Sequence, residues 1–580
     1  MQLRQRISTT QRSLSFNSLK GGAGAPASLF PFYMKRSYGF IAALALLLAG
    51  SSCKEQPVEL PTAILSSFSF CGKSTSVNSV PVNVPLEGVY MDFEFTKPLD
   101  IDAFDPSLLL VSGCSSELFA FSVTGEDRRT LHVGTVAPLP AFSRISLRLC
   151  AGKNLGVNLP DELIFSFTTE YDPSDKFPRI SRDELFEKVQ KAAFLYFWDY
   201  AHPVSGLARE RKGSGDTVTS GGSGFALMTI PVAIERGWIS REEGLAHCLK
   251  VLDFLKDKSE RFHGAWSHWL DGNSGKAIAF STYDDGGDLV ETAFMIQGIL
   301  TLRQYFSHSD EDETRLRALA TELWEGVEWS WYRRDGENQL YWHWSPNVEW
   351  KMNMPIRGWN EALIVYVLAA SSPTYPIDKT VYDKGWANDG ALRNGRNFFG
   401  VTLPLGQDYG GPMFFAHYSF LGLDPRHLKD AYADYWEQNC AHAFINWKYC
   451  AGKPANCYSE SCWGLTASDY SKGYTASSPT NDRGTIAPTA ALASYPYLPE
   501  QSAAAMEYFY YVLGDRLWGE YGFHDAFSLR DRWFADSYIA IDQGPIVIMM
   551  ENARTGLLWD NFMRDSEVQA GLSKLGFSWE

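Results

Sequence analysis

A chain of 580 residues with a net charge of −16 is longer than one hydrophobic core usually organises, so the length predicts two or more domains. Hydrophobic residues make up 45% and charged residues 21%, which excludes wholesale disorder and a polytopic membrane protein. The net negative charge would repel the phosphate backbone of a nucleic acid, and no basic cluster beyond the N-terminal tail compensates for this charge. We therefore expect no nucleic-acid partner.

The N-terminus has the features of an export signal. A positive start at 34–36 is followed by an apolar run over 40–49 and by small residues before Cys53. The run is too short to span a bilayer, and a Cys directly after it is typical of bacterial lipoproteins, with an ordinary cleaved signal as the alternative. We expect 1–53 to be an N-terminal extension and lipoprotein signal peptide. Lipidated Cys53 would anchor an exported protein to the outer membrane, facing the periplasm or the surface.

The next segment predicts a small β domain. Residues 54–62 are polar and contain proline, as expected of a linker. Between 63 and 170, short runs of alternating apolar and β-branched residues are separated by Gly, Pro, Asp and Asn, and they predict strands at 89–95, 144–149 and 163–167. This spacing predicts an immunoglobulin-like sandwich. We expect it to act as a support, with carbohydrate binding as the alternative, and 171–180 to be a second linker.

From 181 to 580 the period becomes helical. Ser181 and Ser240 each precede a glutamate three residues later, Glu184 and Glu243, which is the signature of a capping box. Further helices are predicted at 288–306, 312–332, 360–370, 426–447, 500–513 and 536–558. Without strands between them, these helices favour an (α/α)6 toroid over an α/β fold, and an α-solenoid remains open from periodicity alone. The predicted fold is mainly α, with the small β-sandwich before it.

Three acidic stretches carry the candidate chemistry. Asp284, Asp288 and Glu291 crowd the start of one predicted helix, which is more than helix capping requires. Glu361 enters an otherwise apolar helix, and Asp542 lies in an apolar run beside Gly544-Pro545. An isolated acid in apolar sequence needs a substrate, a proton or an arginine as its partner. These carboxylates are therefore candidates for catalysis.

Aromatic and polar loops accompany the acids. An aromatic loop just before Glu361 is suited to stacking on pyranose rings, although aromatic side chains are as often part of the core. A further polar loop contains Asp469. The predicted substrate-binding residues are Asp284, Glu291, Asp542, Trp342, His343, Trp344, Trp359 and Asp469.

Five motifs over 180–580 resemble one family. They are Asp284-Asp285-Gly286-Gly287-Asp288-Leu289-Val290-Glu291-Thr292, Gly358-Trp359-Asn360-Glu361-Ala362, His417-Tyr418-Ser419-Phe420-Leu421-Gly422, Trp463-Gly464-Leu465-Thr466-Ala467-Ser468-Asp469 and Ile541-Asp542-Gln543-Gly544-Pro545. Together they resemble the bacterial glucoamylase-like family. The resemblance implies an (α/α)6 fold and activity on a glucan, since the family includes inverting endo-β-1,2-glucanases. A Cys-rich insert at 448–462 departs from the family pattern.

An inverting hydrolase needs one carboxylic acid and one carboxylate on opposite faces of the sugar. We assign Glu361 as the general acid and Asp288 as the general base, and the two roles can be exchanged. The alternatives are another glucan-active enzyme on the same scaffold, such as a glucoamylase, β-glucosidase, α-glucosidase, phosphorylase or lyase, and a surface lipoprotein that binds glycan without cleaving it. We expect a monomer acting on an oligo- or polysaccharide.

No cofactor or metal is expected, since no His pair, P-loop or dinucleotide fingerprint is present. Cys450, Cys457 and Cys462 lie within thirteen residues but have no histidine at ligand spacing. A disulfide-stapled loop is the preferred interpretation, with a zinc site as the alternative.

Overall fold

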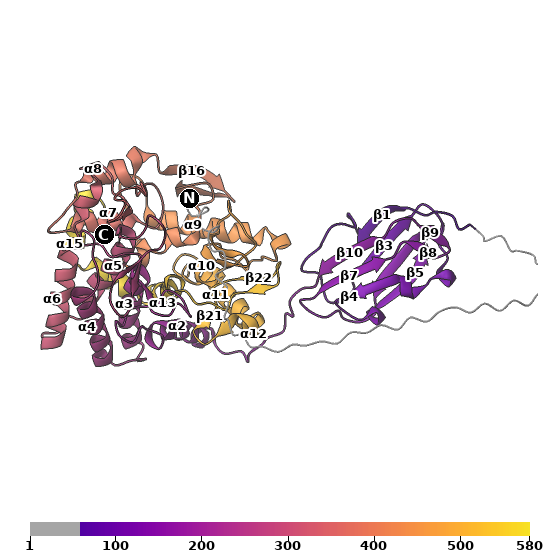
Figure 1. Cartoon of the computed structure of the whole chain (residues 1–580), viewed down its shortest axis with the longest axis horizontal. Helices are drawn as coiled ribbons and strands as arrows, with labels where there is room; N and C mark the ends of the chain where they lie inside the picture. The colour runs from indigo at the N-terminus through magenta and orange to yellow at the C-terminus, as the bar shows by residue number, and fades with distance from the viewer. Residues whose placement is uncertain (1–58, 580) are drawn as a thin grey trace, which may run out of the picture.

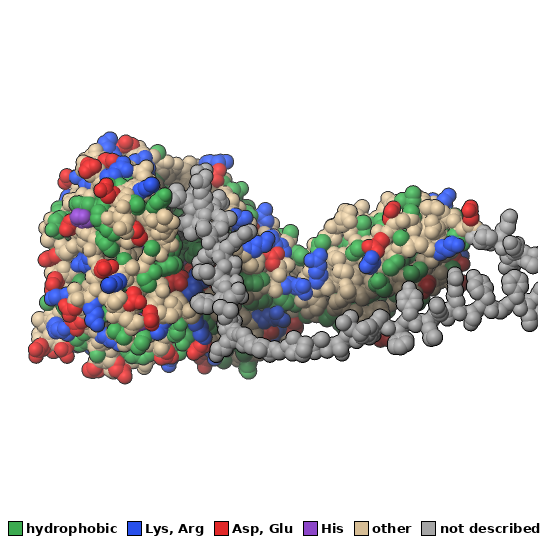
Figure 2. Space-filling view, in the orientation of Figure 1, with side chains coloured by type: hydrophobic (Ala, Val, Ile, Leu, Met, Phe, Trp, Pro, Cys, Tyr) green, Lys and Arg blue, Asp and Glu red, His purple; other side chains and the backbone are tan. Residues whose placement is uncertain are grey.

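The computed structural model describes residues 59–579 and has two parts, a β domain and a larger, mainly helical domain (Figure 1). The signal peptide predicted over 1–53, the lipidation site Cys53 and most of the linker 54–62 lie outside the described residues. Within 59–579, no helix is both long and apolar enough to cross a bilayer. Acidic and basic side chains intermingle on the face seen in Figure 2.

The β domain contains two antiparallel sheets and a short hairpin. The strand order is β2-β1-β3-β6-β5 in the larger sheet and β10-β7-β4 in the smaller one, and β8 pairs with β9. The strands are β1 (Leu65–Phe70), β2 (Lys73–Ser74), β3 (Tyr90–Phe95), β4 (Leu109–Ser112), β5 (Phe119–Thr124), β6 (Thr130–Thr135), β7 (Arg144–Leu149), β8 (Gly152–Asn154), β9 (Val157–Leu159) and β10 (Leu163–Thr168). The strands predicted near 89–95, 144–149 and 163–167 are present as β3, β7 and β10.

Alternating side chains from both sheets form the core of this domain. In β3, Met91, Phe93 and Phe95 are buried, whereas the residues between them are not. Phe68 of β1 bridges the two sheets, because its ring centroid lies 4.8 Å from that of Phe93 and 4.6 Å from that of Phe165 in β10. Period-two burial of this kind is what an antiparallel sheet with one covered face requires.

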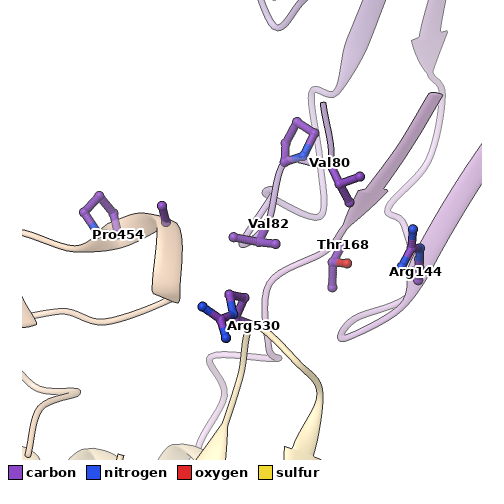
Figure 3. A pocket seen from close by; sticks show the side chains of 8 residues that line it. Val80, Val82, Arg144, Thr168, Pro454 and Arg530 are labelled. Carbon is purple, nitrogen blue, oxygen red and sulfur yellow. The ribbon is translucent and has the colours of Figure 1, made fainter. Parts of the chain in front are cut away.

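An aromatic contact joins the β domain to the helical domain. Tyr171 packs edge-on against Phe142 at 4.9 Å between ring centroids, and Phe534 of the helical domain lies 6.2 Å from the Tyr171 ring. The Tyr171 hydroxyl also donates a hydrogen bond to Asp515 Oδ1 at 2.7 Å. Beside this contact lies a cavity of about 580 Å³ between the two domains, bordered by Arg144 on one side and Arg530 on the other (Figure 3).

The helical domain contains all 14 α-helices of the described residues. They are α2 (Arg182–Trp198), α3 (Ser220–Glu235), α4 (Arg241–Asp257), α5 (Leu289–Tyr305), α6 (Glu311–Glu325), α7 (Leu363–Ser371), α8 (Lys379–Val381), α9 (Tyr435–Ala451), α10 (Pro488–Leu492), α11 (Pro499–Glu507), α12 (Gly514–Leu517), α13 (Ala540–Arg554), α14 (Leu557–Met563) and α15 (Ser566–Leu575). Both predicted capping boxes are formed, at Ser181 and Ser240.

The helices fall into two groups by burial. α3, α5, α7 and α13 are buried around most of their circumference. α4, α6 and α15 bury one face only, as surface helices do. α3 packs against both α5 and α13, α7 packs against α5, and α2, α6 and α15 cover α13, α5 and α7 from outside.

Most predicted helices are present with shifted ends. The helix predicted at 312–332 ends at Glu325, the helix predicted at 426–447 begins only at Tyr435, and that predicted at 536–558 divides into α13 and α14. Helix α3 was not predicted from the sequence. Its sequence contains three glycines near the start and an internal proline, and burial on all sides removes the amphipathic period that predicts surface helices.

Glycines explain how α3 can lie against α5. A Cβ added at Gly224 would lie 2.2 Å from the carbonyl oxygen of Phe294, and one added at Gly298 would lie 2.2 Å from the carbonyl oxygen of Gly224. The two backbones therefore approach more closely than any other residue allows. This approach brings the start of α3 beside the start of α5, where the acidic cluster lies.

Candidate active site

Asp288 is the N-cap of α5 and is completely buried. Its Oδ1 accepts hydrogen bonds from the backbone N–H groups of Val290 and Glu291, at 3.0 and 2.9 Å. The short pairing of β14 (Gly287–Asp288) with β15 (His343–Trp344) places Asp288 opposite His343. Backbone N–H groups of α5 thus hold Oδ1 of Asp288, and His343 on the paired strand contacts Oδ2.

Two histidines bind the second oxygen of Asp288. His268 Nδ1 lies 3.1 Å and His343 Nε2 lies 3.3 Å from Asp288 Oδ2. His343 Nε2 also lies 3.0 Å from Asp284 Oδ2, and His268 Nδ1 lies 3.8 Å from Glu291 Oε1. Four predicted residues, Asp284, Asp288, Glu291 and His343, are therefore brought together by one network whose fifth member is His268.

This network stabilises the protonated forms of both histidines and the ionised form of Asp288. Burial opposes protonation of both imidazoles, but the surrounding carboxylates outweigh it and raise the pKa of His268 to about 9 and that of His343 to about 10. For Asp288, burial favours the neutral form, but the two histidines hold its pKa well below the usual range. At neutral pH the pair of histidines is therefore cationic and Asp288 is ionised.

Glu291 depends on the start of α3. The backbone N–H of Gly221 donates to Glu291 Oε2 at 2.9 Å, and a Cβ at Gly221 would lie 2.3 Å from that oxygen. Only glycine leaves room for the carboxylate at this position. The close contact between α3 and α5 thus positions a predicted substrate-binding residue.

Glu361 lies at the start of α7 and has 5% of its surface exposed. Asn360 Oδ1 accepts a hydrogen bond from Ala362 N at 2.9 Å, as in an Asx turn just before the helix. Ser419 Oγ donates to the carbonyl oxygen of Glu361 and accepts from Ile364 N at 3.0 Å. A residue of the His417 motif thus holds the backbone of Glu361 in place.

Tyr418 connects the acidic stretches electrostatically. It is buried, and its ring packs on Phe225 of α3 and Phe294 of α5, with centroids 5.2 and 5.6 Å away. Burial raises its pKa well above the usual value, and the charges of Asp542, Tyr474, Glu361 and Glu291 raise it further. The charges of carboxylates at the starts of α5, α7 and α13 therefore all act on one buried tyrosine.

A second acidic group lies at the start of α13. Asp542 and Asp525 are each 3% exposed, and their carboxyl groups lie within hydrogen-bonding reach of each other. Asp525 Oδ2 accepts from Asp469 N at 2.7 Å. The carboxylate of Asp469 in turn accepts hydrogen bonds from Arg211 at 3.1 Å and from Ser537 Oγ at 2.6 Å.

The pKa shifts in this second group are opposite to those at α5. Burial, followed by the charge of Asp469, raises the pKa of Asp525 to about 7. Burial and the neighbouring Asp525 raise the pKa of Asp542 well above its usual value. Arg211 contacts Asp469 and Glu210 directly and acts on the Asp525–Asp542 pair only from farther away, so among the described residues no cation forms an ion pair with either acid of the pair.

The predicted aromatic residues are packed in the protein. The Trp344 ring lies 5.3 Å from Trp331 and 5.2 Å from His263, and Trp359 lies 6.1 Å from Phe420. Trp342 is 6% exposed, and its carbonyl oxygen accepts a hydrogen bond from Leu289 N. These contacts connect the three tryptophans to the walls of the site, and little of Trp342 or Trp359 is free for stacking.

His268, which is partly buried, and the buried Asp284 and Asp288 have ligand atoms within 4.8 Å of one another. The raised pKa of His268 favours its protonated form, in which the imidazole pairs with these carboxylates as a cation. The described cysteines are free thiols, so the disulfide-stapled loop expected from the sequence is not formed, and Cys450, Cys457 and Cys462 are all buried. Burial raises the pKa of Cys457 to about 11, so that thiol is protonated at neutral pH.

Four further residues belong to the site but were not predicted from the sequence: His268, Asp525, Arg211 and Tyr418. Asp525 was detectable, because it is a lone acid in the apolar stretch Phe523-His524-Asp525-Ala526-Phe527, as Asp542 is in its own. His268 lies in a Trp-rich loop that gives no spacing signal. Tyr418 was within a recognised motif, but only the packing of three helices gives it a role.

Comparisons with known proteins identify the family of the chain. Residues 353–566 match the sequence model of the Glycoamylase family, described as "Putative glucoamylase". A curated relative from Parabacteroides distasonis, an exo beta-1,2-glucooligosaccharide sophorohydrolase (non-reducing end), is 45% identical over 417 residues, which are 68% of this chain and 58% of that protein. The chain thus spans less than two thirds of that relative's length.

Two solved structures are also similar. The endo-beta-1,2-glucanase of Chitinophaga pinensis, in complex with sophorotriose and glucose, is 53% identical with a TM-score of 0.68, covering 69% of this chain and 99% of its own. A beta-1,2-glucanase of Parabacteroides distasonis is 37% identical with a TM-score of 0.67, covering 87% of this chain and 74% of its own. The match to the Parabacteroides distasonis structure covers more of this chain than the helical domain contains, so it includes part of the β domain. On these matches, the chain belongs to the glycoamylase family, together with β-1,2-glucanases of known structure.

Proposed function

We propose that this protein is an inverting glycoside hydrolase that cleaves β-1,2-glucan or its oligosaccharides. The observation that carries the proposal is the set of buried carboxylates at the starts of α5, α7 and α13, Glu291, Glu361 and Asp542, whose charges all act on the buried Tyr418. An inverting mechanism requires a proton donor and a proton acceptor on different segments, on either side of the sugar. The named relatives, which act on β-1,2-linked glucose, support the choice of linkage.

In this proposal Glu361 donates a proton to the departing glycosidic oxygen. It lies at the mouth of α7, where Ser419 and Asn360 fix its backbone. Water attacks the anomeric carbon from the opposite face and loses a proton to a general base. The bond between the anomeric carbon and the leaving oxygen breaks, and the new hydroxyl has the inverted configuration.

The general base predicted from sequence is Asp288, and Asp542 is a second candidate. Asp288 is ionised, as a base must be, but its oxygens already accept from two backbone N–H groups and two histidines. A carboxylate with a strongly lowered pKa is also a weak proton acceptor. Asp542 has a buried oxygen, Oδ2, without a conventional hydrogen-bond donor, and its raised pKa favours proton uptake.

Purified protein incubated with β-1,2-glucan tests the function. We expect release of reducing ends, with the α-anomer formed first by NMR, and about a 1,000-fold lower kcat for Glu361→Gln with binding retained. Products from α-glucans alone would favour a glucoamylase-type enzyme, and an unsaturated, ultraviolet-absorbing end would favour a lyase. Binding without any cleavage would favour a glycan-capture protein.

We further propose the finer architecture and location predicted from sequence. The two layers of helices support an (α/α)6 toroid, and the paired antiparallel sheets support an immunoglobulin-like module that acts as a spacer. Lipidation at Cys53 would anchor a monomeric enzyme to the outer membrane. Palmitate labelling that is lost in Cys53→Ala tests the anchor, and secretion of unlabelled wild-type protein would contradict it.

A further inference from the structure

The pairing of Asp525 with Asp542 has the geometry of two acids that share a proton. Asp525 Oδ1 and Asp542 Oδ2 are both buried and have no conventional donor within hydrogen-bonding distance. The other oxygen of Asp525 accepts from Asp469 N, which fixes the side chain and leaves Oδ1 to meet Asp542. Two buried oxygens without donors are costly unless a proton lies between them.

The charges around the pair oppose a second negative charge on it. Among the described residues, no cation forms an ion pair with Asp525 or Asp542; Arg211 acts on both acids, but Asp469 of β18 (Ala467–Tyr470) and Glu210 bind it directly. The negative charge of Asp469 acts on both acids as well. Tyr418, on which Asp542, Glu291 and Glu361 also act, is neutral because its pKa is raised. His524, next in sequence to Asp525, is neutral at pH 7, because burial lowers its pKa.

We propose that Asp525 is a positioning residue that shares a single proton with Asp542 and so sets the basicity of Asp542 in the sugar-binding site. With its proton on Oδ1, Asp525 donates a hydrogen bond to Asp542 and leaves Asp542 as the proton acceptor. The catalytic consequence rests on the proposed hydrolase function. The shared proton itself does not depend on that function, so the two are tested separately.

Asp525→Asn separates this role from a structural one. The asparagine Oδ1 can still accept from Asp469 N, and its Nδ2 can still donate to Asp542, so the geometry is kept while the titrating proton is lost. Asp531→Asn is the matched control. Asp531 follows β22 (Phe527–Ser528), pairs with Arg530 and lies outside the acidic group.

Infrared spectroscopy of the unliganded protein tests the shared proton. At pH 6 to 7 we expect a carboxylic-acid C=O band in the wild type and in Asp531→Asn that is lost in both Asp525→Asn and Asp542→Asn. A band that is absent from the wild type, or that persists in Asp525→Asn, would overturn the proposal. This readout requires no substrate, so it stands even if β-1,2-glucan is not hydrolysed.

The pH profile of kcat/KM tests the positioning role. In the wild type, loss of the shared proton near pH 7 adds a second negative charge to the pair, and an asparagine cannot undergo this ionisation. In Asp525→Asn we therefore expect the change in kcat/KM near pH 7 to disappear, with little change in KM, whereas Asp531→Asn should retain it. An Asp525→Asn profile that matches those of the wild type and Asp531→Asn would show a structural contact only and would overturn the role assigned to Asp525.

Discussion

The acidic groups at the starts of α5 and α13 both contain buried aspartates, but these aspartates have opposite proton affinities. At α5, the buried carboxylate of Asp288 meets two histidines, and its pKa is lowered. At α13, the buried carboxylates of Asp525 and Asp542 meet each other, and their pKa values are raised. Burial acts in the same direction in both groups. The difference teaches that the partner, and not the burial, decides whether an acid buried at these two helix starts holds a proton.

α3 lies between the two groups and touches both. A Cβ at Gly221 would meet Glu291 of the α5 group, whereas a Cβ at Gly222 would meet Ala540 at the start of α13. Two adjacent residues of α3 thus pack against different acidic groups, Gly221 against the group at α5 and Gly222 against the start of α13. Substitutions at these positions can disturb one group at a time.

The largest expected effect distinguishes the two groups directly. Asp288→Asn and Asp542→Asn should each lower kcat on β-1,2-glucan, and the variant of the true base should lose about 1,000-fold. Only that variant should also lose the acidic limb of the pH profile, because the limb reports protonation of the base. If both variants keep the limb, neither residue is the base and the assignment fails.

A somewhat smaller effect is expected at the start of α3. Gly221→Ala places a methyl group against Glu291 Oε2, and displacement of this carboxylate should lower kcat/KM about 100-fold. Gly222→Ala is the matched control, since its methyl group would crowd Thr219 and Ala540 instead. Equal losses of activity in the two variants would show general disruption of α3 and would contradict a specific role for Gly221.

The histidines at α5 should make stability depend on pH in the alkaline range. Their pKa values are raised to about 9 and about 10 in the folded protein, against about 6.5 when unfolded. Their contribution is therefore complete below pH 6.5 and is lost as pH rises through 9 to 10. His343→Gln should flatten the fall in Tm between pH 7 and 10 by on the order of 3 °C. Parallel Tm curves for variant and wild type would contradict this charge pairing.

The smallest expected effect lies in a lower pH range and comes from α13. Asp525 has a pKa of about 7 in the folded protein against about 3.9 when unfolded, so its contribution is complete below about pH 4 and is lost as pH rises through 7. Asp525→Asn should thus gain about 1 to 2 °C in Tm relative to wild type between pH 5 and 8. A difference in Tm that stays constant with pH would contradict the raised pKa.

Local sequence signals predicted much of the helical domain and the acidic part of the site. The capping boxes at Ser181 and Ser240 are formed as expected, and Asp284, Asp288 and Glu291 do gather at one helix start. α3 escaped prediction because a helix buried on every side has no polar face to give a period. His268 escaped because its partners are distant in the chain, whereas Asp525 carried the same signal as Asp542, a lone acid in an apolar stretch, and was overlooked.

The sequence by itself determined which segments become helices with polar ends, and that acids occupy those ends, since capping and amphipathic periods act over a few residues. Only the tertiary structure decided which acids are charged. The pKa of a buried carboxylate depends on whether a histidine, an arginine or another acid lies within a few ångströms in a medium of low dielectric constant. His343 reaches Asp288 across a strand pair, and Asp525 reaches Asp542 from a separate loop, and neither contact follows from spacing along the chain.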